Sequence, residues 1–101
     1  MELKDGCIQI FVKPKTRNFT YLPAVYHAKA NSSITWIANG NWAAQFYNGT
    51  PLKEGTSLSA SKGVELKTTV TDVKGVYHFA VAVEIGGEVF LDAGCPTIII
   101  D

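Results

Sequence analysis

The clearest strand pattern in the sequence runs from residue 76 to residue 87 and reads Val-Tyr-His-Phe-Ala-Val-Ala-Val-Glu-Ile-Gly-Gly. Successive side chains of a β-strand point to opposite faces. Large apolar residues stand at every second position from 77 to 85, and this alternation predicts a strand over 76–85. The expected core face carries Tyr77, Phe79, Val81, Val83 and Ile85. The opposite face carries Val76, His78, Ala80, Ala82 and Glu84. The following Gly-Gly pair predicts a hairpin turn, with 88–91 as the returning strand.

Similar short segments lie on both sides of this strand. They are 8–12, 24–30, 34–37, 64–70 and 97–100, with Gly, Pro, Asn or Asp between them. The composition of 39–61 predicts loops and short edge strands around a few buried anchors. Because no segment has a convincing helical period, we predict an all-β fold, a Greek-key β-sandwich of seven or eight strands. An immunoglobulin-like topology fits the same pattern.

Length and composition indicate an ordinary globular protein. With 101 residues, of which 47% are apolar and 18% charged, we expect a single domain over 1–101 with one core. Nine basic residues balance nine acidic ones, so no net charge would attract nucleic acid. The small basic cluster is typical of a solvated strand edge and comprises Lys4, Lys13, Lys15 and Arg17. No apolar run reaches the roughly 18 to 20 residues that span a bilayer.

Several short motifs, in their order and spacing from about Ile8 to Ile100, resemble the cupredoxin family. They are Phe19 with Leu22-Pro23, Ile34-Thr35-Trp36 with Asn39, Gly75-Val76-Tyr77-His78-Phe79 and the closing strand Thr97 to Ile100. In cupredoxins the G-x-Y-x-F motif leads into the copper-binding cysteine. The resemblance therefore implies the cupredoxin form of the sandwich.

The resemblance also implies where copper ligands would lie. The family holds copper with two histidines, one cysteine and usually a weak methionine. Carried over, the first histidine falls near Ala44, the cysteine at Val81 and the second histidine near Glu84. The chain's methionine is Met1, far from these positions. The expectation is that the copper site is absent, that there is no cofactor, and that blue-copper electron transfer is lost with it.

The remaining metal ligands leave one alternative open. His27 and His78 could form a non-standard copper or zinc site with Cys95 or Glu84, but each lies within an expected strand, where an ordinary solvent-facing or partly covered histidine is the simpler expectation. Cys7 and Cys95 could form a disulfide or be two buried apolar side chains, because their spacing matches neither a redox motif nor a zinc site.

Nothing in the sequence marks a catalytic site. No serine or cysteine stands in a G-x-S-x-G context, and the chain has only two histidines to serve as a base. The carboxylates at Asp72, Glu84, Glu88 and Asp92 are scattered over turns and strand ends, where solvation explains them. We therefore predict that the chain is not an enzyme.

The segment Asn39–Tyr47 is the candidate binding site. It combines small flexible residues with Trp42, Phe46 and Tyr47, and exposed aromatic side chains on a loop suit a partner protein or a carbohydrate. The alternative is that Trp42 and Phe46 plug one end of the core.

These observations lead to one prediction with two alternatives. The prediction is a non-enzymatic, metal-free cupredoxin-like binding or structural module with no nucleic-acid partner and no membrane span. The alternatives are the non-standard metal protein and an immunoglobulin-like structural domain of a larger surface protein. The compartment is periplasmic or extracellular if the resemblance holds and a leader was removed, and otherwise cytoplasmic. The oligomeric state stays open.

Overall fold

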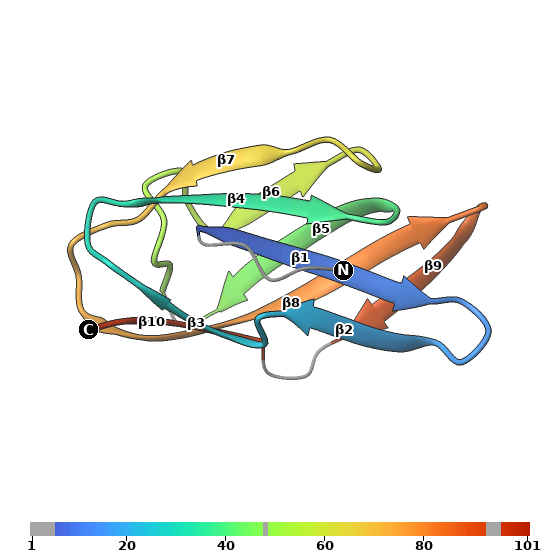
Figure 1. Cartoon of the computed structure of the whole chain (residues 1–101), viewed down its shortest axis with the longest axis horizontal. Coiled ribbons are helices and arrows are strands. Elements are labelled where there is room, and N and C mark those ends of the chain that lie inside the picture. Colours follow the sequence, from blue (N-terminus) through green and yellow to red (C-terminus); the bar gives the residue numbers. More distant parts are fainter. Residues whose placement is uncertain (1–5, 48, 93–95) are drawn as a thin grey trace.

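The computed structural model describes residues 6–47, 49–92 and 96–101, and these residues form ten strands and no helix (Figure 1). Among them, accordingly, there is no helix that could cross a bilayer. The strands are β1 (Cys7–Lys13), β2 (Asn18–Leu22), β3 (Val25–Ala28), β4 (Ser33–Ala38), β5 (Asn41–Tyr47), β6 (Ser57–Ala60), β7 (Leu66–Thr69), β8 (Gly75–Ile85), β9 (Glu88–Asp92) and β10 (Thr97–Ile100). The predicted all-β class is confirmed.

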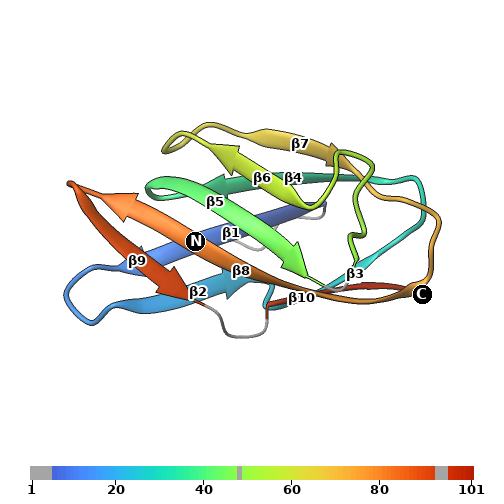
Figure 2. The same cartoon turned by 180° about the vertical axis from the view of Figure 1, so that it is seen from behind.

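The strands form two sheets that pack face to face. One sheet has the order β2-β1-β4-β7, and the other has the order β3-β10-β8-β5-β6 with β9 also paired to β8. Figure 1 shows the first sheet in front of the second, and Figure 2 shows the second sheet from its outer side. The strands are more numerous than the seven or eight predicted, because β2 and much of the segment predicted as loops pair into the sheets.

Strand β8 is the centre of the larger sheet. It has eleven residues and pairs along 78–84 with β5 on one edge. Its first part pairs with β10, and its last part pairs with β9 through a two-residue turn. Gly86 and Gly87 have φ values of 59° and 85°, a conformation that glycine adopts without steric cost. The stretch with the clearest strand pattern in the sequence is thus the most extensively paired strand.

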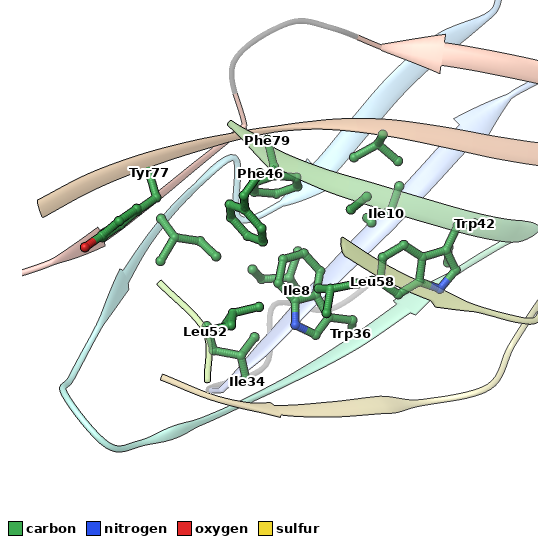
Figure 3. Close-up of a cluster of buried hydrophobic side chains, with 14 of the residues drawn as sticks. Ile8, Ile10, Ile34, Trp36, Trp42, Phe46, Leu52, Leu58, Tyr77 and Phe79 are labelled. Atoms are coloured by element: carbon green, nitrogen blue, oxygen red, sulfur yellow. The ribbon is translucent and has the colours of Figure 1, made fainter. Parts of the chain in front are cut away.

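The core lies between the two sheets and consists of the inward-facing residues of both. Trp36 of β4 is fully buried, and its ring lies 5.3 Å from the ring of Phe79 and 5.7 Å from the ring of Trp42. The Trp36 Nε1–H donates a hydrogen bond of 2.9 Å to Thr68 Oγ1, so the buried indole nitrogen is satisfied. Figure 3 shows this cluster, with Trp42 at one end and Tyr77 at the other.

Asn39 and Gly40 connect β4 to β5 and carry the chain between the sheets. The Asn39 side chain donates to the Val12 carbonyl at 2.8 Å and accepts from the Val12 N–H at 3.0 Å, which extends the parallel pairing of β1 and β4. Gly40 is buried against β8, where an added Cβ would lie 2.5 Å from the Glu84 carbonyl oxygen and 2.8 Å from Val83 Cγ1. Only glycine permits this close approach.

We expect Gly40→Ala to lower the free energy of unfolding by about 1–3 kcal/mol, because the new methyl group clashes with the backbone of β8. Gly75→Ala is the matched control, since its Cβ would meet the Tyr77 ring at 3.4 Å, an ordinary contact. Urea denaturation of both variants measures the difference. Equal losses for the two variants would contradict the close packing of Gly40.

Candidate functional site

Two of the three positions to which the copper ligands were carried over are neighbours in the structure. Ala44 of β5 and Val81 of β8 are register partners, and Leu58 of β6 is the next partner beyond Ala44. Ala44 is 3% exposed and Val81 is 2% exposed, so both side chains lie in the core. Neither side chain has a nitrogen, oxygen or sulfur atom that could bind a metal.

The third position, Glu84, lies on the opposite face of β8. Its register partners are Asn41 and Val89. The carboxylate accepts hydrogen bonds from the Gly87 backbone N–H at 2.6 Å and from the Asn41 amide at 2.8 Å, and these bonds lower the pKa of Glu84. Glu84 therefore stabilises the hairpin turn and does not converge with Ala44 and Val81.

The stretch after Val81, where the resemblance places the other ligands, is a β-hairpin held at two points. Arg17, in the β1–β2 turn, forms a 2.7 Å ion pair with Glu88 and lies 4.7 Å from the centre of the Phe90 ring. Tyr21 of β2 donates a 2.7 Å hydrogen bond to the Asp92 carboxylate. Burial, then the hydrogen bond and the charge of Asp92, raise the pKa of Tyr21 well above its usual range. These contacts tie the hairpin to the smaller sheet.

The two histidines do not meet. His78 of β8 lies beside Thr97, with 3.1 Å between Nδ1 and Oγ1, whereas His27 of β3 lies 3.4 Å from the Asp101 carboxylate. His78 is in register with Val25 through Thr97, and His27 is two residues further along β3. Cys95 and the proposed Cys7–Cys95 pairing lie outside the described residues, and Cys7 is buried in the other sheet. The described part of the chain holds no group of three or more His, Cys, Asp or Glu placed for a metal.

The prediction that the aromatic segment Asn39–Tyr47 is a loop is wrong, because residues 41–47 form strand β5. Its period of two sends Trp42 and Phe46 into the core, where they are 3% and 2% exposed. Tyr47 is 40% exposed on the outer face. Of the three aromatic residues, Tyr47 alone can contact a partner without a change in the fold.

The outer face of the larger sheet has a hollow floored by small side chains. Its volume is about 540 Å³, and its outward-facing residues are Ala43 and Gln45 of β5, Ser57 and Ser59 of β6, Ala80 and Ala82 of β8, and Leu91 of β9. Ser59, Ala43, Ala82 and Leu91 form one row across four strands. We call these seven residues the Ala/Ser hollow. Leu91 rises at its side and is 76% exposed.

Exposed apolar side chains lie on the same face of the larger sheet as the hollow. Figure 2 shows this sheet turned towards the viewer. Among the described residues, seven large apolar side chains are exposed, and five of them lie on this face: Val25, Tyr47, Val76, Val89 and Leu91. The ionisable groups of this face nearest to the hollow are His78 and Glu84 of β8, which lie one row beyond Ala80 and Ala82, and Asp92 also lines the hollow. The described residues of the two rows with Ala80 and Ala82 carry no ionisable side chain on this face.

Comparison of the coordinates with solved structures finds a pseudoazurin, an amicyanin and a purple cupredoxin. A pseudoazurin from Sinorhizobium matches with a TM-score of 0.55 and 19% identity, over 92% of this chain and 72% of that one. An oxidized amicyanin mutant matches with a TM-score of 0.52 and 17% identity, over 99% and 87%. A purple cupredoxin from Nitrosopumilus maritimus matches with a TM-score of 0.53 and 16% identity, over 92% and 98%. The fold is the cupredoxin fold.

This result decides between the two predicted topologies against the immunoglobulin-like one. The likeness establishes the fold alone, since no family model and no curated protein matches the sequence. Two further structures that match, both amicyanin mutants at 16% identity, are named as Cu(I) forms. The residues at the carried-over positions do not fit copper, because Ala44 and Val81 have no donor atom and Glu84 faces away.

Sequence reasoning missed the Ala/Ser hollow. The outward face of 76–85 was recognised from its alternation, but its rows with β5, β6 and β9 depend on strand register. The alternating serines at 57 and 59 were the available signal for the outward-facing side of β6.

Two tryptophans of equal size allow a test of the core polar contacts. Trp36 Nε1 has the Thr68 hydrogen bond, whereas Trp42 Nε1 is buried without a hydrogen-bond partner. We expect Trp36→Phe to lower the free energy of unfolding by about 1–3 kcal/mol more than Trp42→Phe, which removes an unsatisfied donor. Urea denaturation measures both values, and a larger loss for Trp42→Phe would refute this account.

The Tyr21 hydroxyl makes the free energy of unfolding depend on pH in the alkaline range. Its pKa is higher in the folded chain than the value of about 10 expected when unfolded, so its contribution is complete below pH 10 and declines above it. We expect Tyr21→Phe to lower the free energy of unfolding by about 1 kcal/mol at neutral pH. Between about pH 9 and 11 the free energy of unfolding of this variant should fall less steeply than that of the unmodified chain. Denaturation curves across this range test the slope, and identical slopes would count against it.

Proposed function

We propose that this chain is a metal-free, non-enzymatic cupredoxin-like domain that binds a protein partner through the outer face of its larger sheet. The observation that carries the proposal is the pairing of Ala44 with Val81 as buried hydrocarbon side chains. Where the resemblance expects a histidine and the cysteine, the chain has core packing. We propose in addition that 1–101 form one domain.

The replacement of ligands by apolar side chains favours a folded protein that needs no metal. Valine is apolar and somewhat larger than cysteine, so it fills the core here without an unpaired polar atom. The Tyr21 and Arg17 contacts stabilise the hairpin that follows, so a bound ion is not required to order it. An apo cupredoxin-like domain of this kind would keep its shape in the presence of a chelator.

The outer face of the larger sheet is the binding surface that the exposure pattern favours. The smaller sheet presents Gln9, Lys13, Thr20, Thr35 and Lys67 on its outer face, and its large apolar side chains there are at most partly exposed. The larger sheet presents exposed aliphatic side chains and alanines instead. Contiguous exposed apolar surface on a protein of this kind is typical of an interaction site.

The chemistry of this face suits a protein better than a carbohydrate. Sugar rings are commonly bound by stacking on exposed aromatic rings, which present a broad apolar face. Tyr47 is the exposed aromatic side chain of the described part of this face, and it stands near one end. Aliphatic side chains over a floor of alanine and serine match the core of a protein interface, where charged residues are depleted.

The metal-free part of the proposal is tested by elemental analysis and by melting curves with copper, zinc or a chelator. We expect less than stoichiometric metal and an unchanged melting temperature, since an ion that binds the folded state would raise it. Melting curves of Ala44→His and of its control Ala44→Leu, recorded in parallel, measure how a single added donor atom at this position changes the effect of metal on the melting temperature. Stoichiometric metal, or a melting temperature that rises with metal and returns with chelator, would refute the proposal and direct attention to His27, His78 and Cys95.

A further inference from the structure

Strand β3 forms one edge of the larger sheet, and no described strand pairs with its outer side. On its inner side the Thr97 N–H of β10 donates to the Ala24 carbonyl at 3.0 Å. The bonded positions of a parallel ladder alternate along each strand, so Tyr26 is the next residue of β3 that bonds to β10. The N–H and C=O groups of Val25 and His27 therefore point to the free edge, where they are placed to bond an added strand.

A polar hollow of about 450 Å³ lies beside this edge, between β3 and the beginnings of β1 and β4. Figure 1 shows the chain passing from β3 to the start of β4 at this end of the molecule. The last pair of β1 with β2 joins Gln9 to Leu22, so β2 does not run alongside the first two residues of β1. The lining comes from both sheets and from the connection between β3 and β4, and comprises Gly6, Tyr26, His27, Lys29, Ser32 and Ser33.

The charge of this hollow favours an acidic ligand. Lys29 is exposed, and no ion pair within the described part of the chain involves it. There is no Asp or Glu among the described lining residues, and Asp101 lies outside the lining, 3.4 Å from His27 Nδ1. The Ser32 hydroxyl donates to the Lys29 carbonyl at 2.6 Å, which leaves the Ser33 hydroxyl as the serine donor for a ligand. A carboxylate here would meet a cation and a hydroxyl donor.

We propose that the β3 edge binds an extended peptide with an acidic side chain, which adds to the larger sheet antiparallel to β3. Two peptide residues exchange backbone hydrogen bonds with Val25 and His27, because bonded pairs in an antiparallel ladder are two residues apart. The peptide residue between them lies opposite Tyr26, and its side chain points with that of Tyr26 towards the hollow. The backbone bonds provide affinity, and the hollow provides selectivity for the carboxylate. This site is separate from the outer face proposed above.

The first experiment titrates the isotope-labelled chain with the acetylated and amidated peptide Thr-Val-Glu-Val-Thr and follows the backbone amides by NMR. The contact spans two bonded pairs, so we expect a Kd of about 0.1–1 mM. The amide signals of Val25 and His27 should shift, and their protons should exchange more slowly with solvent. The same peptide with N-methyl groups on both valines cannot form these bonds and should not bind.

The acidic preference is tested with a second peptide, in which glutamine replaces the glutamate. It should bind about two- to fivefold more weakly, because the partner charge on Lys29 is exposed. Lys29→Gln should abolish the difference between the two peptides. Lys62→Gln is the matched control and should preserve it, since the neighbouring Gly63 N–H bonds to the Ala38 carbonyl at the other end of β4.

Val25→Pro tests the edge from the side of the protein. It removes the outward N–H without removing a bond between β3 and β10, and it should abolish binding. Val25→Thr keeps the N–H and should bind as the unmodified chain does. Melting curves show whether each variant folds, and if Val25→Pro does not, the N-methylated peptide tests the same bonds on the unmodified chain.

Three results would overturn the proposal. The first is the absence of shifts at Val25 and His27 up to about 5 mM peptide. The second is equal binding of the N-methylated peptide. The third is protection of these two amides that grows with chain concentration without peptide, because a second copy would then occupy the edge. None of these results bears on the metal content or on the outer face of the larger sheet.

Discussion

The pairing of β8 on both edges is the constraint on which the rest of the structure depends. Because β5 holds one edge and β10 and β9 share the other, no residue of β8 can turn over without breaking a ladder of backbone hydrogen bonds. The inward face then supplies Tyr77, Phe79, Val81 and Val83 to the core, and the outward face supplies the alanines of the hollow. Core and candidate binding surface are two consequences of one alternation.

The same constraint separates this chain from the Cu(I) amicyanin that shares its fold. A copper site needs donors from more than one segment to converge on a point. Here Ala44 and Val81 do converge, but as hydrocarbon side chains, and the chain continues past Val81 as a regular hairpin. Arg17 and Tyr21 hold that hairpin from the smaller sheet by an ion pair and a hydrogen bond. Packing and polar contacts thus occupy the region to which the ligands were carried over.

The central strand, the hairpin after it and the fold class could be predicted from sequence, because alternation over 76–85 and the Gly-Gly turn are local signals. The segment Asn39–Tyr47 could not. Its asparagines, glycine and alanines have low strand propensity, and its burial comes from pairing with β8 and β6. Trp42 and Phe46 were therefore expected either as exposed loop side chains or as core residues. The pairing of β5 with β8 and β6 places both in the core.

Local order along the chain is sufficient to show which side chains of each regular strand share a face, and that histidine and cysteine are missing from the positions carried over from cupredoxins. Both are properties of local order along the chain. Which faces meet depends on the pairing of strands that are distant in sequence. Register across β6, β5, β8 and β9 brings Ser59, Ala43, Ala82 and Leu91 into one row, although they are spread over nearly fifty residues of sequence. The physical reason is that strand pairing joins residues through backbone hydrogen bonds, whose partners no local pattern specifies.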